Sequence, residues 1–163
     1  MRLNLFFFRN LILLLIFVFF IPVQLIKASE SNELSKLWQS AIENNKKRNH
    51  YEAIDNYSKA LNIAPKNHLL FYNRGLTYAN LQLLNQAIKD FNSSIKIRSD
   101  FGPAYGDRGM AFYDLNQKDK ACADFKKAAS LKYKIAVNWI NDPKRNSWLS
   151  LIHISEPTRL HCI

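Results

Sequence analysis

The chain repeats itself with a 34-residue period. Sliding the sequence by that step places like residues over like ones through most of its middle part. A period of this length is typical of solenoids, in which each unit is one supersecondary element that buries its apolar face against its neighbours. The aligned positions include Phe71 with Tyr105, Arg74 with Arg108, Gly75 with Gly109, Ala87 with Ala121, Asp90 with Asp124, and Phe91 with Phe125.

Small and aromatic residues recur at helical spacing within each unit, so each unit is predicted to be a pair of helices. Gly75 and Gly109 would let the two helices of a pair approach closely. The predicted helices span residues 33–45, 51–63, 69–81, 85–97, 103–115 and 118–131. A seventh helix is predicted from Tyr133, Ile135, Ala136, Trp139 and Ile140, ending before Asp142 and Pro143.

The pattern Phe71-x-x-Arg74-Gly75-x-x-Tyr78, followed by Ala87 and Phe91, with Pro65 closing the preceding unit, resembles the tetratricopeptide repeat. The resemblance covers Leu34 to about Tyr133. It implies an all-α fold, a right-handed superhelix of three repeats (residues 34–67, 68–101 and 102–133) with a capping helix at 134–148. Two departures are Asn44, where the other repeats have an aromatic residue, and Ser99, where the first repeat ends in Pro65.

The N-terminus has the layout of a secretory signal peptide. Arg2 and Arg9 precede an apolar run from Leu11 to Ile21, and Ala28 offers a small residue before a polar stretch. Residues 1–28 are therefore predicted to be a cleaved signal, and the protein to be exported to a periplasm, a lumen or the extracellular space. The alternative is an uncleaved anchor, a membrane tether through residues 3–21 with the repeats on the exported side.

The C-terminal stretch Leu149 to Arg159 resembles the translation of a sequencing adapter. Residues 149–163 are therefore interpreted as a tail foreign to the protein, and the capping helix at 134–148 as truncated. This interpretation removes His153, His161 and Cys162 from any functional argument. It also leaves open that the repeats are the non-catalytic part of a longer protein whose C-terminal sequence is lost.

The remaining residues favour neither catalysis nor metal or cofactor binding. Cys122 aligns with Ile54 and Ile88, which predicts a buried apolar role, and His50 and His68 fall at positions where the residue type varies, which predicts a surface location. No paired-histidine, Ser-His-Asp or glycine-rich arrangement occurs. The protein is therefore expected not to be an enzyme, and to have no catalytic residues, metal ligands or cofactor.

The positive charge does not indicate a nucleic-acid partner. Residues 29–148 hold 19 basic and 12 acidic residues, a net charge of +7 that is spread along the chain. The basic run Lys46-Lys47-Arg48 falls at a predicted helix end, where cations interact favourably with the helix dipole.

The resemblance implies a binding scaffold, in which the first helix of each pair lines a concave groove that holds a peptide of a partner protein. Asp107 and Asp114 would favour a basic residue in that peptide. Of the positions with which chaperone-binding members clamp a C-terminal carboxylate, only Asn73 is matched, since Trp38, Ile42, Pro103 and Asp107 occupy the others. The groove residues carried over by alignment are Trp38, Ile42, Asn45, Tyr72, Asn73, Leu76, Asn80, Asp107, Met110, Tyr113 and Asp114.

Three functions follow from these observations. The first is an exported scaffold that binds a partner peptide in the groove. The second is a membrane-anchored structural or assembly subunit, and the third is the non-catalytic part of a longer protein.

Overall fold

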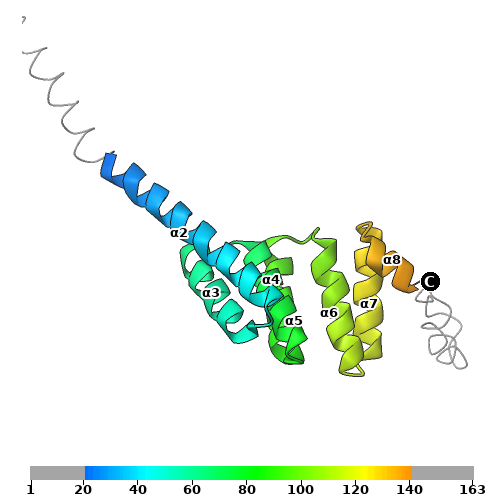
Figure 1. Ribbon diagram of the computed structural model, residues 1–163. Coiled ribbons are helices and arrows are strands. Elements are labelled where there is room, and N and C mark those ends of the chain that lie inside the picture. Colours follow the sequence, from blue (N-terminus) through cyan, green and yellow to red (C-terminus); the bar gives the residue numbers. More distant parts are fainter. Residues whose placement is uncertain (1–20, 141–163) are drawn as a thin grey trace, which may run out of the picture.

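The computed structural model describes residues 21–140. The predicted signal segment up to Phe20, the stop at Asp142 and Pro143, the rest of the predicted capping region and the tail from Leu149 lie outside the described residues. All regular secondary structure in the described part is helical (Figure 1). The helices are α2 (Ile21–Lys46), α3 (His50–Ile63), α4 (His68–Asn80), α5 (Leu84–Ile97), α6 (Gly102–Asp114), α7 (Lys118–Ser130) and α8 (Lys134–Ile140).

The helices form three stacked pairs, α2 with α3, α4 with α5 and α6 with α7, in a right-handed superhelix that α8 covers at one end. Helices α3, α5 and α7 begin at His50, Leu84 and Lys118, so each start lies one full sequence period after the last, as do the starts of α4 and α6. The predicted fold class is therefore confirmed. Among residues 21–140 no helix is both long and apolar enough to cross a membrane.

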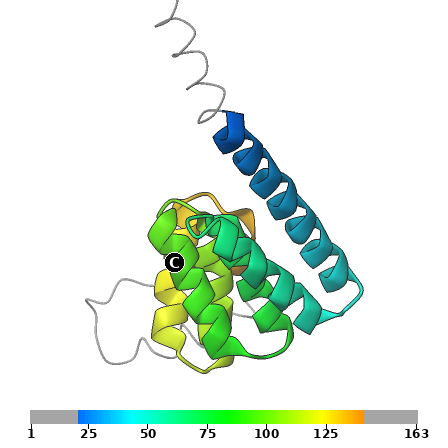
Figure 2. The same cartoon turned by 90° about the vertical axis from the view of Figure 1, so that its left-hand side faces the viewer.

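The predicted start of the first helix at residue 33 is wrong, because α2 begins at Ile21. No glycine or proline interrupts residues 23–46, and Pro22 stands in the first turn, where its missing N–H is not needed. The first part of α2 projects from the other helices (Figures 1 and 2), and Val23, Leu25 and Ile26 are exposed. The repeat period contained no information upstream of the first unit.

Each helix pair turns through a residue in the left-handed conformation. Arg48, Gln82 and Asn116 have φ values of 64°, 59° and 58°, and they occupy the same position in the three successive repeats. The residue after each one donates its N–H to a carbonyl five residues back, as Leu83 does to Tyr78 at 2.9 Å. This is the Schellman arrangement, which satisfies carbonyls at a helix end.

Small residues let the helices pack closely. A Cβ added to Gly75 would lie 2.8 Å from Cε1 of Phe91, and one added to Gly109 would lie 3.0 Å from Cε1 of Phe125. In the first repeat the same position is Ala41, which is fully buried. The predicted close approach at Gly75 and Gly109 is therefore confirmed.

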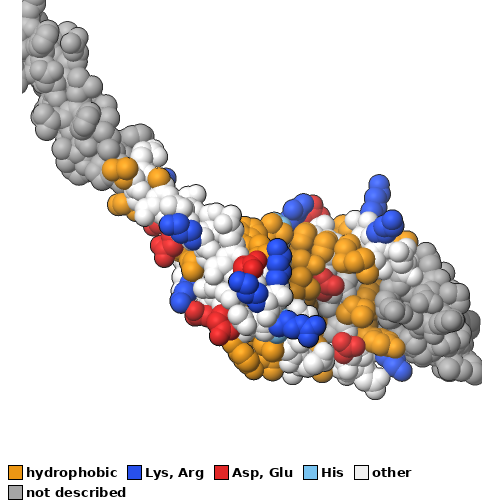
Figure 3. Space-filling model, in the orientation of Figure 1, with side chains coloured by type: hydrophobic (Ala, Val, Ile, Leu, Met, Phe, Trp, Pro, Cys, Tyr) orange, Lys and Arg blue, Asp and Glu red, His pale blue; other side chains and the backbone are white. Residues whose placement is uncertain are grey.

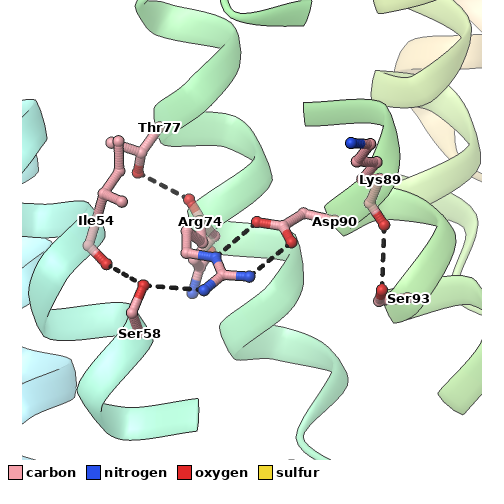
Figure 4. A network of polar contacts seen from close by, with 8 residues as sticks. Ile54, Ser58, Arg74, Thr77, Lys89, Asp90 and Ser93 are labelled. Atoms are coloured by element: carbon pink, nitrogen blue, oxygen red, sulfur yellow. Dashed lines mark hydrogen bonds and ion pairs between the residues drawn. The ribbon is translucent and has the colours of Figure 1, made fainter. Parts of the chain in front are cut away.

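A buried ion pair recurs in the second and third repeats, and Figure 4 shows the one in the second repeat, between Arg74 and Asp90. Arg74 donates to both carboxylate oxygens of Asp90, at 2.7 and 2.8 Å, and to Oγ of Ser58 on the preceding repeat at 2.9 Å. Arg108 bonds Asp124 in the same way and also contacts Asn92 on the repeat before it. We call each set an arginine clamp; it joins the two helices of one pair to the preceding pair.

The first repeat has a neutral pair where the others have the clamp. Ser40 and Asn56 stand at the positions of Arg74 and Asp90, and Asn56 Nδ2 donates to Ser40 Oγ at 3.0 Å. Among the described residues no earlier repeat packs against α2 and α3. A long side chain at the position of Ser40 would therefore find no acceptor on a preceding repeat.

Cys122 is half-buried, like the aligned Ile54 and Ile88. The prediction that these three positions are equivalent is confirmed, whereas the prediction of full burial is wrong.

Candidate peptide-binding groove

The predicted groove residues come from α2, α4 and α6, the first helices of the three pairs. Within the described residues, no group of three or more His, Cys, Asp or Glu side chains is placed to hold a metal ion. On the face seen in Figure 3, the Lys and Arg side chains are scattered and not gathered into one patch. The groove itself divides into regions with different surroundings.

The first region is a pocket of about 430 Å³ between the first two repeats. We call it the asparagine pocket. It contains four of the predicted groove residues together with two that were not predicted to line the groove, Lys46 and Tyr57. Its lining is formed by Ile42, Asn45, Lys46, Tyr57, Asn73 and Asn80.

Asn45 is held by neighbouring side chains. His50 Nδ1 donates to Asn45 Oδ1 at 2.7 Å, and Asn45 Nδ2 donates to Oγ1 of the buried Thr77 at 3.1 Å. Thr77 in turn donates to the carbonyl of Asn73 at 2.8 Å. This chain of hydrogen bonds links α3, α2 and α4, so Asn45 positions the pocket wall. His50, which was predicted to lie at the surface, is half-buried and is hydrogen-bonded to Asn45.

The second region surrounds Trp38, which is half-buried and whose Nε1 has no hydrogen-bond partner among residues 21–140. Two hollows meet at this side chain. One, of about 640 Å³, lies against residues 64–69 at the turn into α4. The other, of about 360 Å³, follows the α2 stripe of Leu34, Trp38 and Ile42. Because Ile42 also lines the asparagine pocket, the α2 side of the groove is one continuous surface.

The third region joins α4 to α6. The Tyr72 hydroxyl donates to Asp107 Oδ2 at 2.6 Å, and the Tyr72 ring meets the Phe101 ring edge-on at 5.0 Å. Burial raises the pKa of Asp107, and the hydrogen bond from Tyr72 opposes that shift in part. Burial and the nearby Asp107 also raise the pKa of Tyr72. Tyr72 and Asp107 therefore satisfy one another, and of the two predicted groove acids only Asp114, at the end of α6, is exposed.

Three further predicted groove residues, Leu76, Met110 and Tyr113, are partly buried. Met110 and Tyr113 pack against the cluster formed by buried residues of α7 and α8. Leu76 is half-buried in the middle of α4, and Asn80 is exposed at its end. The structure thus brings the residues of repeats one and two together in a pocket, and gives Met110 and Tyr113 a packing role in repeat three.

The family profile described as "Tetratricopeptide repeat" matches residues 69–101 and 102–135. Curated relatives include the TPR repeat-containing thioredoxin TDX of Arabidopsis thaliana, 34% identical over 82 residues. Another is heat shock protein STI1 of Saccharomyces cerevisiae, 32% identical over 81 residues. The alignments cover 50% and 49% of this chain but only 22% and 14% of those proteins.

Solved structures extend the likeness to a larger share of the chain. The first TPR of Spaghetti (RPAP3), bound to the HSP90 peptide SRMEEVD, is 27% identical, with a TM-score of 0.63 over 66% of this chain and 87% of that chain. MamA is 25% identical, with a TM-score of 0.60 over 64% of this chain and 61% of that chain. Residues 69–135 therefore match the tetratricopeptide-repeat profile, and the chain shares the fold of solved tetratricopeptide-repeat domains over 66% of its length.

Proposed function

We propose that the protein is a non-catalytic scaffold that binds a peptide segment of a partner protein in its groove. The similar Spaghetti domain holds a peptide, which supports this use of the fold. The observation that carries the proposal is the asparagine pocket, where the side-chain amides of Asn73 and Asn80 make no hydrogen bond with another described residue. Such amides can bond the backbone of an extended peptide.

The partner we propose is not a chaperone tail held by its C-terminal carboxylate. The positions that would supply the cations of such a clamp hold Trp38, Pro103 and Asp107, and Asp107 is bonded to Tyr72. An acid at that place would repel a carboxylate.

Export remains part of the proposal and rests on the sequence of residues 1–28. A second candidate, a membrane-anchored assembly subunit, is favoured by one observation: α2 runs without a break from Ile21 through Ala28 into the first repeat. Determining the mass of the mature N-terminus distinguishes them, since cleavage predicts a chain that starts at Ser29. The small share of the relatives that the chain covers supports the third candidate, part of a longer protein.

The groove is tested with peptides selected from a random display library on the full chain. Their affinity is then measured for wild type, Asn73→Ala and Lys89→Ala by fluorescence anisotropy. Asn73 lines the pocket. Lys89 is exposed on α5, the second helix of its pair, whereas the groove residues come from the first helices. We expect Asn73→Ala to weaken binding by about 1–2 kcal/mol and Lys89→Ala to leave it unchanged. Equal affinity of all three proteins would refute the proposal that the peptide binds in the groove.

A further inference from the structure

The asparagine pocket is lined by groups that can donate hydrogen bonds. Lys46 comes from the last turn of α2, Tyr57 from α3, and Asn73 and Asn80 from α4. None of the described residues that line the pocket is acidic. The nearest acid along α2, Glu43, pairs with Lys47 at 3.3 Å, and Lys46 forms no ion pair with a described residue.

Tyr57 is the most informative member of this set. Its side chain is 1% exposed, yet its hydroxyl makes no hydrogen bond with another described residue and is not sealed off from the pocket that Tyr57 lines. The hydroxyl faces the pocket, so it can donate a hydrogen bond to water or to a ligand that replaces the water. Burial raises the pKa of Tyr57, so the group stays protonated at neutral pH and acts as a donor.

We propose that the asparagine pocket binds the side-chain carboxylate of an Asp or Glu within the partner peptide. The proposal rests on the groove binding peptides at all. A carboxylate has two oxygens that accept about four hydrogen bonds, which matches the ammonium of Lys46, the hydroxyl of Tyr57 and the amides of Asn73 and Asn80. One cation facing one anion also leaves the occupied pocket without net charge.

A side chain fits better than a chain end because the groove continues past the pocket. Ile42 lines both the pocket and the hollow beside Trp38, so a peptide can pass from one to the other. Lys46, Asn80 and Asp114 occupy one position in three successive repeats. The side chain at this position is therefore positive in the first repeat, neutral in the second and negative in the third. An acidic residue of the peptide is accepted at the end of the groove formed by the first repeat.

The test uses two display libraries of peptides blocked at both ends, one with a central Asp and one with Asn in its place. Selected peptides are measured against the full-length wild type, Lys46→Gln, Tyr57→Phe and the charge-matched control Lys89→Gln. We expect the Asp library to be enriched on the wild type, and replacing the Asp of a selected peptide by Asn to weaken binding by about 10-fold. Lys46→Gln should abolish most of that preference, Tyr57→Phe should reduce it without lowering the melting temperature, and Lys89→Gln should retain it.

Three results would overturn the proposal. Equal binding of Asp and Asn peptides refutes the carboxylate site and leaves the peptide groove standing. Binding that requires a free C-terminus replaces the side chain by a terminal carboxylate. Failure of both libraries to yield any binder, whether the C-terminus is blocked or left free, refutes the peptide groove itself, and the carboxylate site with it.

Discussion

The arginine clamp of the second repeat can be tested by converting it into the arrangement of the first repeat. Arg74→Ser alone leaves Asp90, which is 7% exposed, without its two charge-assisted hydrogen bonds. Removing one partner of a fully buried pair costs about 3–5 kcal/mol. Because the Arg74 side chain is 19% exposed and water can approach it, we expect the lower value, about 3 kcal/mol.

Adding Asp90→Asn to Arg74→Ser should recover part of this loss. The double variant removes the unpaired charge and recreates the neutral pair that Asn56 and Ser40 form at 3.0 Å. We expect the double variant to be about 1–2 kcal/mol more stable than Arg74→Ser, since the remaining cost is that of neutral hydrogen bonds.

Urea unfolding followed by circular dichroism measures both differences, with Lys59→Ser as the control. Lys59 pairs with Asp55 at 2.6 Å, but the two side chains are 58% and 60% exposed. Breaking that pair should cost no more than about 0.5 kcal/mol. A double variant that is no more stable than Arg74→Ser would refute the reasoning, because the cost would then not come from an unpaired buried charge.

Three further substitutions test other features by the same unfolding measurement. Gln82→Gly should stabilise the protein by about 0.5–1 kcal/mol, since Gln82 has a φ of 59° that costs little for glycine; a loss of stability would contradict this. Asp107→Asn should stabilise the protein at neutral pH, because burial raises the pKa of Asp107 above its ordinary 3.8. The protonated Asp107 side chain therefore contributes to folding stability below pH 3.8, and this contribution is lost as the pH rises through the pKa of the folded state. An advantage of Asp107→Asn that grows below pH 3.8 would refute the assignment. Gly106→Ala should destabilise the protein by about 1–3 kcal/mol despite the better helix propensity of alanine, because its Cβ would lie 2.6 Å from Cε1 of Tyr133. Unchanged stability would show that the Tyr133 ring can move away at little cost.

The helix pairs were predictable because the sequence period compares each position with others of the same role. The period also contained a signal for the arginine clamp, since Arg74 and Asp90 recur together as Arg108 and Asp124. Opposite charges that repeat at a fixed separation on two packed helices indicate a pair. The start of α2 was not predictable in this way, because no other repeat contains its first residues.

The asparagine pocket was predicted only in part, for a related reason. Asn45 and His50 both differ from the residues at the same positions of the other repeats, and in the structure their side chains are hydrogen-bonded to each other. Tyr57 aligns with Phe91 and Phe125 one and two periods later, and the rings at all three positions are buried. Spacing alone does not show that the hydroxyl at the far end of a buried ring reaches a pocket.

The arginine clamp makes the repeat unit transferable. Each unit with a clamp contains both charges of its own ion pair, Arg74 with Asp90 or Arg108 with Asp124. From the preceding unit it needs only a small polar acceptor, Ser58 or Asn92. A duplicated copy of residues 68–101 inserted directly after Phe101 would find that acceptor in its predecessor and offer one to its successor. The first unit has Ser40 and Asn56 in place of the clamp residues. A copy of it placed between two other units would therefore make no arginine hydrogen bond to the preceding unit. Lengthening of the array by recombination is therefore expected between its second and third units and not at its N-terminal edge.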